Sequence, residues 1–578
     1  MGRRKTVGFL TSGIMDEMQE QLCKGIFKES AKDDVNIVVI PVKYIDREMK
    51  DIPDLYEYQY KTNAESITAN NIDCLIIAAD YIGCLTTEKN LVRFVDGIRD
   101  RGIPIILAAA NMDGYSGVVF DNKAGIIEGM EYLVEDLGIR RIGMLKSVEH
   151  NADVAERYEA YSEMMEYYKL DIDPKSVITT NLSTDCKPEC EQLLDDNPDL
   201  EAVICVNDDV ALGLYDVMKS RGLVPGKDLK VMGFDNSISG SMVTPSLATV
   251  DASAESLGER VYMNVRLLLE DWPVGQMTIP TRFILRDSFG SFLDMKNIDD
   301  EILNKNFLDK YFHRIFFKFD NISSPEDFEI LVMYKSLMNM IIDYVEDNSY
   351  SHERVEFIKS KADDFFRTGV MEYTDVDVLL AYIHRVCLAV TNRVGDYEEK
   401  CHVYDTFSAI LEGIIAAVHD NDLNNENSLN QSINNLKNLV EDTLDLVHGG
   451  DEGYANIVSN LKLFGVNNAY VYIYEQPIVH KQGEKLEMPE TVLLKVAMTD
   501  GDIKIVPSIE QPVEMDHLFN NRFITTEKFN MVLMPLYFRE TLYGSILYDL
   551  TDVTYRSGDF MAKQYATTAR VIDILKRG

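Results

Sequence analysis

The sequence lacks a long apolar run. A helix needs roughly 18 or more consecutive apolar residues to cross a bilayer, and no such run occurs among the 578 residues. The N-terminus, MGRRKTVGFLTSG, starts with basic residues but has no apolar core and no cleavage site, so it is not a secretory signal. We therefore expect a cytoplasmic protein without a membrane-spanning segment.

Basic residues are too few to balance the acidic ones. The chain has 57 Lys and Arg against 96 Asp and Glu, which gives a net charge of -39. A surface this acidic repels the phosphate backbone of nucleic acids, so direct nucleic-acid binding is disfavoured. The acidity also favours solubility, and it identifies no partner.

Cysteine is scarce and scattered. Several of the 8 Cys lie in apolar runs, such as DCLIIAAD and AVICVND, as buried free thiols do. Cys186 and Cys190 form a lone CxxxC without a second pair, whereas a structural zinc site needs four ligands. We expect no metal site, and the cysteine usage fits a reducing cytoplasm.

Familiar catalytic motifs are missing too. There is no GxSxG, no phosphate-binding loop ending in GK[ST], and no HExxH among the 9 His. His384 with Cys387, and Cys401 next to His402, lie in helical runs without a third partner, which favours packing or surface roles. We expect no catalytic residues, no cofactor and no enzymatic activity in this chain.

Residues 5–290 alternate between apolar strands and amphipathic helices. The strand KTVGFLTSG is followed by a helix in which Met18, Leu22, Ile26 and Phe27 share one face, and a second series starts at RRIGMLKS. Continuous apolar strands between helices predict parallel sheets covered on both faces. Two series predict two lobes, with ligands bound where loops leave the carboxyl ends of the strands.

The remainder of the chain has two other patterns. Helical periodicity replaces strands from about residue 296 to 446 and ends in NDLNNENSLNQS, which we interpret as a polar linker or helix cap. A helix, several strands that predict an antiparallel sheet, and a closing helix follow. We therefore predict three domains: a two-lobed α/β ligand-binding domain (1–292), an all-α connector (293–428) and an α+β domain ending in a signalling helix (429–578).

The stretch HGGDEGY, residues 448–454, differs by one residue from the GGDEF motif of enzymes that make cyclic di-GMP. Those enzymes place the motif on a β-hairpin, where its acidic residues hold metal ions. Here the flanking sequences are helical, and no DxLTGLxNR segment precedes them. We interpret Gly449 and Gly450 as a helix C-terminus, and Asp451 and Glu452 as the start of the next helix.

Five segments, in order, carry a resemblance to a known family. They are GIPIILAAANMDGYSGVVFDNKAGIIEGMEYLVEDLGIRRIGML, AERYEAYSEMMEYYKLDIDP, AVICVNDDVALGLYDVMKSRGLVPGKDLKVMGFDN, TPSLATVDASAESLG and ILRDS. Residues 5–290, about half of the chain, resemble the effector-binding domain of the lactose- and galactose-repressor family. The resemblance implies a periplasmic-binding-protein-like fold that binds a small polar effector, such as a sugar or related metabolite, in the cleft between its lobes.

The resemblance implies ligand contacts in the second lobe at Arg157, Asn207 and Asp235. A carboxylate accepts hydroxyl protons and a guanidinium donates to the same hydroxyls, so the pair suits a vicinal diol. The neighbouring Asp208 and Asp209 are open to a different interpretation, as caps of the following helix, which we favour for Asp209.

The first lobe supplies further candidates after its strands. Ser12 and Met15 follow the first strand, Asp80 and Tyr81 follow another, and Asp121 ends VVFD. Tyr81 can stack on the face of a sugar ring. For Asp80 and Asp121 a simple role in a turn is an equal alternative.

Two departures from the family pattern stand out. The first strand begins at Lys5, where the family's repressors carry a DNA-binding helix-turn-helix and hinge, and a polar ligand contact of the family falls near Ala252. The sugar specificity of the family therefore does not transfer. A homodimer is expected, because sensors of this family pair side by side and the terminal helix can pair as well.

The last domain resembles a GAF-type domain through its strand order, YVYIYEQP and YGSILYDL. The order of the domains resembles bacterial signalling proteins with a repressor-like sensor. The leading hypothesis is a ligand-responsive regulator. The alternatives are the sensory part of a diguanylate cyclase whose catalytic GGDEF domain lies beyond residue 578, or a transcription regulator acting through a DNA-binding domain or partner outside this chain.

Overall fold

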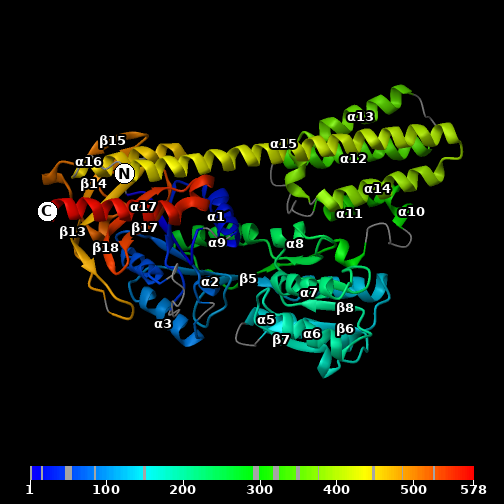
Figure 1. Ribbon diagram of the computed structural model, residues 1–578, viewed down its shortest axis with the longest axis horizontal. Helices are drawn as coiled ribbons and strands as arrows, with labels where there is room; N and C mark the ends of the chain where they lie inside the picture. The colour runs from blue at the N-terminus through cyan, green and yellow to red at the C-terminus, as the bar shows by residue number, and fades with distance from the viewer. Residues whose placement is uncertain are drawn as a thin grey trace. The chain divides into compact units, whose positions relative to one another are not determined.

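The computed structural model describes most of the chain (Figure 1), in residues 3–14, 17–45, 55–83, 86–147, 152–290, 298–316, 325–346, 352–374, 376–444, 450–484, 486–524 and 528–577. Its contacts group into two compact units. The first contains Met1–Phe120, Ser253–Ile279 and Ser428–Gly578, and the second contains Asp121–Ala252 and Pro280–Asn427. The predicted three-domain division stays a prediction.

The first unit contains a parallel sheet formed by the N-terminal residues. Its strands lie in the order β5-β4-β3-β1-β2, with β11 beside β5. They are β1 (Lys5–Thr11), β2 (Val35–Pro41), β3 (Cys74–Ala78), β4 (Ile105–Ala108), β5 (Gly117–Asp121) and β11 (Met277–Pro280). Strands β1 to β5 are apolar and mostly buried, as the sequence predicted for a sheet covered by helices, whereas β11 is mostly exposed.

Helices cover this sheet, namely α1 (Glu17–Ser30), α2 (Ala79–Gly83), α3 (Glu88–Arg99), α9 (Ala254–Leu269) and the 3-10 helix η1 (Glu57–Ser66). Helices α1 and α9 approach closely because glycines face the contact. A Cβ atom at Gly25 would lie 2.0 Å from the carbonyl oxygen of Glu255. The α/β alternation expected for the first lobe is therefore present.

The C-terminal residues extend the same sheet. Strand β17 (Asn530–Phe538) pairs in parallel with β2, with Val532 opposite Val39. Antiparallel strands continue from it in the order β17-β18-β13-β14-β15, giving a 12-stranded sheet. The additional strands are β18 (Thr541–Asp549), β13 (Ala469–Val479), β14 (Thr491–Thr499), β15 (Asp502–Ile505) and β16 (Pro512–Glu514), which pairs with β14.

Polar contacts reinforce the connection between β2 and β17. The amide nitrogen of Asn63 donates to Pro41 O at 2.8 Å and to Leu533 O at 3.1 Å. Tyr58 Oη donates to His480 O at 2.9 Å. The first lobe and the C-terminal residues are therefore one folded body, which the sequence did not indicate.

Two helices pack with the C-terminal strands. Helix α16 (Asp451–Asn460) contacts β14 and β15, and α17 (Asp552–Arg577) contacts β17. Helix α16 begins at Asp451, with Gly450 at a φ of 89° before it. The prediction that Asp451 and Glu452 begin a helix is confirmed, whereas Gly449 lies outside the described residues.

The second unit contains a second parallel sheet, in the order β7-β6-β8-β9, and an antiparallel pair, β10-β12. The strands are β6 (Ile142–Ser147), β7 (Val177–Thr180), β8 (Ala202–Cys205), β9 (Lys230–Met232), β10 (Thr249–Asp251) and β12 (Arg282–Ile284). The helices are α4 (Ala124–Glu131), the π-helical turn η2 (Tyr132–Asp136), α5 (Ala152–Tyr167), α6 (Lys187–Asp196), α7 (Asp208–Ser220) and α8 (Ile238–Met242). The predicted second lobe is present.

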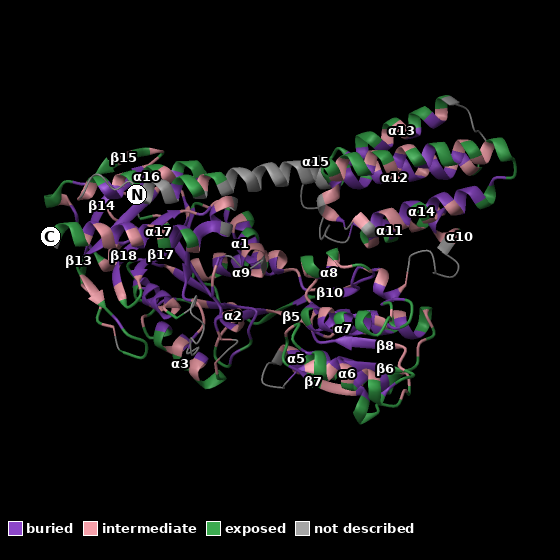
Figure 2. Ribbon diagram, viewed as in Figure 1, coloured by how far each residue is buried: buried purple, intermediate pink, exposed green. Residues whose placement is uncertain are grey.

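The described residues between 298 and 444 are helical and contain no strand (Figure 2). The helices are α10 (Ile298–Ile302), α11 (Leu308–Ile315), α12 (Pro325–Glu346), α13 (His352–Phe366), α14 (Val376–Arg393) and α15 (Tyr397–Leu444). Tyr334 and Tyr382 are buried at their centre, with 2.9 Å between the two hydroxyl oxygens.

Helix α15 corrects one prediction. The stretch NDLNNENSLNQS, residues 421–432, was interpreted as a linker or helix cap, but it lies inside this 48-residue helix. Asn and Ser disfavour helix only mildly, and the stretch contains neither Gly nor Pro, the residues that interrupt helices most strongly. The polar composition of this stretch therefore did not predict where the helix ends.

One described segment, Tyr397–His419 of α15, is long and apolar enough to cross a membrane by length and composition. Its mean hydropathy is 1.3, and 28% of it is buried. A single helix of this kind is weak evidence for a membrane, because core helices of other proteins pass the same test.

Candidate ligand-binding site

Arg157 is held rigidly in the second lobe. It lies on α5 and is 9% exposed. Its Nη1 donates to Val206 O at 2.7 Å, and its Nε donates to Asn122 Oδ1 at 3.2 Å. The guanidinium stacks on Phe234, 3.5 Å from the ring centroid. These contacts fix its orientation before any ligand arrives.

Asp235 lies beside Arg157, as the sequence predicted from their separate motifs. Its Oδ1 is 3.7 Å from Arg157 Nη2, and its side chain is 37% exposed. The backbone of Asp235 has a φ of 107°, a conformation that non-glycine residues rarely adopt. A strained backbone that presents a partly exposed carboxyl group beside a fixed guanidinium is typical of a functional site.

The Asp235 carboxyl group also has an altered proton affinity. Burial raises the pKa of Asp235 to about 7, Arg157 opposes the rise, and Asp208 and Asp209 add to it. Because the side chain is still partly exposed, water screens part of this effect. A carboxyl group with such a pKa can both donate and accept hydrogen bonds near neutral pH.

Asn122 and Asp153 complete this polar cluster, and sequence reasoning missed both. The buried Asn122 donates to Asp153 Oδ1 at 2.9 Å and to Glu156 Oε2 at 3.0 Å. Burial raises the pKa of Asp153, against the effect of Arg157. One usable signal was the position of Asp153, one helical turn before Arg157 on the same face of α5.

Asn207 lies at the start of α7 and caps this helix. Its Oδ1 accepts from Val210 N at 3.0 Å and caps α7, while its Nδ2 donates to Leu182 O at 3.1 Å. The interpretation of Asp208 and Asp209 as caps is therefore wrong, because Asn207 is the capping residue. Its amide is engaged within the second lobe, and a ligand contact for it stays a prediction.

Asp208 links several loops of the second lobe. It accepts from Thr249 Oγ1 at 2.6 Å and from Ser237 N at 2.7 Å. Burial raises its pKa to about 6, although these bonds oppose the rise. Asp208 thus supports the loop that carries Asp235.

Asp121 has contacts of the kind that its alternative interpretation predicted. Its Oδ1 accepts from Lys123 N at 3.0 Å and from Ala124 N at 3.1 Å, at the start of α4. These bonds are typical of a turn residue. A ligand contact at Asp121 stays a prediction.

The first-lobe candidates lie after two neighbouring strands. Ser12 is buried directly after β1, and Asp80 and Tyr81 are half-buried in α2, directly after β3. Because β1 pairs with β3 in parallel, these loops leave the same edge of the sheet. Met15 lies outside the described residues.

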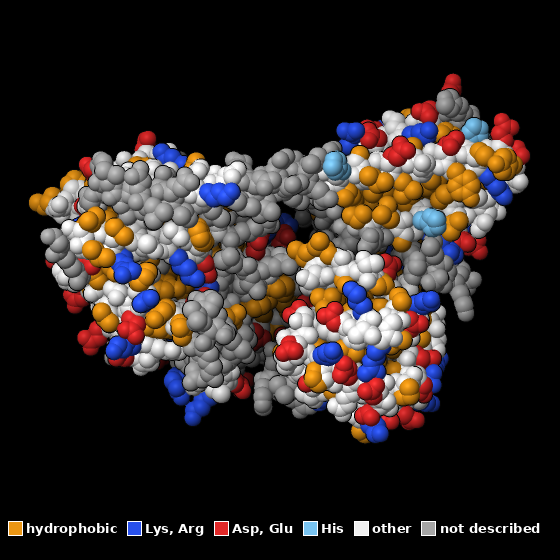
Figure 3. Space-filling model, viewed as in Figure 1, with side chains coloured by type: hydrophobic (Ala, Val, Ile, Leu, Met, Phe, Trp, Pro, Cys, Tyr) orange, Lys and Arg blue, Asp and Glu red, His pale blue; other side chains and the backbone are white. Residues whose placement is uncertain are grey.

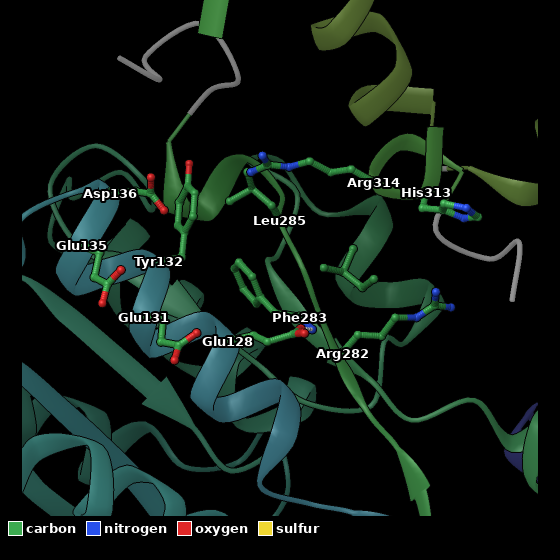
Figure 4. A pocket seen from close by; sticks show the side chains of 11 residues that line it. Glu128, Glu131, Tyr132, Glu135, Asp136, Arg282, Phe283, Leu285, His313 and Arg314 are labelled. Atoms are coloured by element: carbon green, nitrogen blue, oxygen red, sulfur yellow. Dashed lines mark hydrogen bonds between the residues drawn. The ribbon is translucent and has the colours of Figure 1, made fainter. Parts of the chain in front are cut away.

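A separate surface pocket of about 360 Å³ lies elsewhere in the second unit. Figure 4 shows Tyr132, Phe283 and Leu285 between the carboxylates of Glu131 and Asp136 on one side and Arg314 on the other. The Arg314 guanidinium lies 5.7 Å from the Tyr132 ring centroid. The acidic side of the pocket is the exposed face of α4 and η2. None of the predicted site residues lines the pocket.

One group of possible metal ligands occurs among the described residues. Ligand atoms of Glu514, Asp516 and His517 lie within 4.8 Å of one another. Asp516 accepts from Asn70 Nδ2 at 2.6 Å and contacts His517 Nδ1 at 2.7 Å, and both contacts lower its pKa. These groups are exposed or half-buried and already partner one another, and exposed acidic groups are common without an ion.

The first half of the chain has a two-lobed α/β fold like that of periplasmic binding proteins. Residues 131–289 match the family described as a periplasmic binding protein-like domain. About half of the chain resembles the effector-binding domain of LacI-family regulators.

Curated relatives carry the same resemblance. The HTH-type transcriptional regulator IdnR of Escherichia coli is 26% identical over 205 residues, which cover 34% of this chain and 58% of IdnR. The probable HTH-type transcriptional repressor ExuR of Bacillus subtilis is 23% identical over 298 residues, which cover 50% of this chain and 82% of ExuR. This chain thus spans little more than half of the length of IdnR.

Among solved structures, the transcriptional regulator CelR–cellobiose complex is 18% identical, with a TM-score of 0.41. The similarity covers 50% of this chain and 86% of that one.

Proposed function

We propose that this chain is a cytoplasmic, ligand-responsive regulatory protein that binds a small polar, sugar-like effector. The observation that carries the proposal is the pair of Arg157 and Asp235, 3.7 Å apart and fixed at the carboxyl ends of β6, β8 and β9. Ligands of open α/β sheets bind at this edge.

The chemistry of the cluster favours a polyhydroxylated molecule. Arg157 provides N–H donors, Asp235 provides oxygens that accept or donate, and Asn122 keeps Arg157 in place. Adjacent hydroxyl groups both donate and accept, so one diol can satisfy both side chains. Ser12, Asp80 and Tyr81 are our candidates for first-lobe contacts to the same effector.

The regulatory role rests on resemblance. IdnR and ExuR are named as transcriptional regulators of the helix-turn-helix type, and we infer that this chain shares effector sensing with them. In our proposal the chain is a homodimer, and its C-terminal GAF-like domain transmits the effector-bound state to a partner or output. The comparisons lend no support to a diguanylate cyclase.

Calorimetry of the intact chain against a panel of sugars and sugar acids tests the proposal. We expect at least one ligand whose affinity falls by tenfold or more, about 1.4 kcal/mol, in both Arg157→Ala and Asp235→Ala. The matched control is Arg141→Ala, because Arg141 is an exposed second-lobe arginine paired with Asp199. The assignment fails if hits bind Arg157→Ala and Asp235→Ala as tightly as the control.

A further inference from the structure

An uncharged stripe runs along the first half of α15. Its members recur at alternating spacings of four and three residues, and they are Tyr397, Cys401, Tyr404, Ser408, Leu411, Ile415 and Val418. This spacing is that of the a and d positions of a heptad repeat, sustained over about three heptads. We call these seven residues the α15 stripe.

The α15 stripe is distinct from the face that packs within the second unit. Val403, Phe407, Ile410 and Ile414 are buried, and they form that inner face. In the stripe, by contrast, Tyr397 is 81% exposed, Tyr404 52% and Ile415 62%, and the other members are exposed or half-buried.

The helix thus carries more apolar surface than its own chain covers. Figure 3 shows hydrophobic side chains gathered over the helical region. Contiguous exposed apolar surface of this kind marks interaction sites, and a heptad spacing selects another helix as the partner.

The charges beside the stripe indicate which helix fits. One flank carries Glu398, Asp405 and Glu412, and the other carries Lys400. In a parallel pair of identical helices, position g of one helix faces position e of the next heptad in the other. Lys400 would then face Asp405 of the partner subunit. Because the dimer is symmetric, this contact would be formed twice. An antiparallel pair would bring the acidic flanks together.

We propose that a second copy of this chain docks on the α15 stripe, forming a parallel, in-register coiled coil between the two α15 helices. The three acidic side chains on the flank disfavour the alternative of an anionic lipid surface. The interface does not involve the effector-binding cluster. Arg157→Ala and Asp235→Ala are therefore expected to leave dimerisation unchanged, so this inference and the proposed function can fail separately.

Cys401 allows a direct test of the geometry. It occupies an a position and is exposed, whereas the other described cysteines are buried. In a parallel, in-register dimer, equal a positions face each other, which brings the two thiols within reach of a disulfide. Mild oxidation of the intact chain with diamide, which takes up the two thiol hydrogens, should give a covalent dimer on non-reducing gels. Cys401→Ser should abolish it.

Charge exchange tests the pairing independently of oxidation. Lys400→Glu and Asp405→Lys should each weaken the dimer in sedimentation equilibrium by tenfold or more in dissociation constant. The double variant should restore it, because the exchanged charges again face each other. Ile415→Asp should dissociate the dimer, whereas Ala416→Asp, at an exposed position beside the stripe, should not.

Three outcomes would overturn the inference. One is a chain that is monomeric at micromolar concentration. Another is a dimer that survives Ile415→Asp and forms no Cys401 cross-link, which would place the interface elsewhere. The last is a monomer that floats with vesicles of phosphatidylcholine and phosphatidylglycerol and loses this property in Ile415→Asp, which would make the stripe a membrane-binding face. Circular dichroism of every variant separates dissociation from unfolding.

Discussion

Lys43 of the first lobe and Asp559 of α17 form an ion pair, with 2.6 Å between Nζ and Oδ2. The two side chains are only 13% and 15% exposed. Glu57 lies 3.4 Å from the same ammonium group, and Tyr60 Oη donates to Asp559 at 3.0 Å. The pair joins residues 516 positions apart in the sequence.

This ion pair lies where the first lobe presents its candidate effector loops. Lys43 follows β2, and Ile14 follows β1, two residues after the candidate Ser12. Helix α17 packs so closely there that a Cβ atom at Gly558 would lie 2.4 Å from Ile14 Cδ1. The C-terminal helix α17 therefore contacts these loops directly.

Asp559→Asn should destabilise the intact chain. Burial alone would lower the pKa of Lys43, but Asp559 and Glu57 outweigh it and raise that pKa. Lys43 therefore stays charged at neutral pH, and the stabilisation is lost only as pH rises through its raised pKa. With Glu57 still present, we expect a loss of about 1–3 kcal/mol in the free energy of unfolding.

Chemical denaturation at pH 7 measures this loss. Lys563→Met is the matched control, because Lys563 is exposed on the same helix, and it should change stability by less than about 0.5 kcal/mol. Equal effects of the two substitutions would show that the ion pair contributes nothing.

Asp235→Asn should change how stability depends on pH. The pKa of about 7 in the folded chain exceeds the value of about 3.9 expected after unfolding. The folded chain therefore binds the carboxyl proton of Asp235 more tightly than the unfolded chain does. This proton stabilises the folded chain at low pH, and that stabilisation is lost as pH rises from about 4 to 7. Asn has no proton to lose, so the variant should gain stability relative to the wild type between pH 5 and pH 8.

Thermal unfolding of both proteins at the two pH values gives this difference. Asp216→Asn serves as control, because Asp216 is exposed on α7 and is not among the charges that shift the pKa of Asp235. A constant difference between Asp235→Asn and wild type at both pH values would contradict the raised pKa.

Much of the two lobes could be predicted because buried parallel strands are continuous apolar runs. Strands such as β3 and β8 are short, completely buried and flanked by helices, so local pattern sufficed. The proximity of Arg157 and Asp235 followed from two family-like motifs. The sequence did not identify Asn122 and Asp153 as members of the polar cluster, because their contacts are formed only when loops from separate strands meet.

The pairing of β2 with β17 had no local signal. Val39 and Val532 are each ordinary strand residues, and nothing in either segment indicates which edge it will join. An apolar strand is compatible with any exposed edge, so such a pairing is set by the whole fold. Nothing in the sequence therefore indicated that the C-terminal strands continue the sheet of the first lobe.

A fragment of residues 1–292 should fold poorly. In the intact chain Ile37, Val38 and Val39 are paired with β17, so truncation exposes an apolar strand edge, which promotes aggregation. We expect most of the fragment in the insoluble fraction, whereas the intact chain remains soluble. Size-exclusion chromatography of both proteins decides this, and a soluble, monomeric fragment with native-like circular dichroism would contradict the prediction.

Asp451, the first residue of α16 and part of HGGDEGY, should be important for stability. Its Oδ1 lies 3.3 Å from Nζ of the buried Lys495, and Gln511 bridges the two with contacts of 2.7 and 2.8 Å. Asp451→Ala would leave that ammonium group without its counter-charge, so we expect a loss of about 1–3 kcal/mol in the free energy of unfolding.

The matched control is Glu452→Ala, at the exposed next position, which should cost less than about 0.5 kcal/mol. Adding Lys495→Met to Asp451→Ala should recover part of the loss, because it removes the unpaired charge. Urea denaturation of the four proteins tests this, and a loss in Asp451→Ala no larger than in Glu452→Ala would mean that Asp451 does not anchor α16.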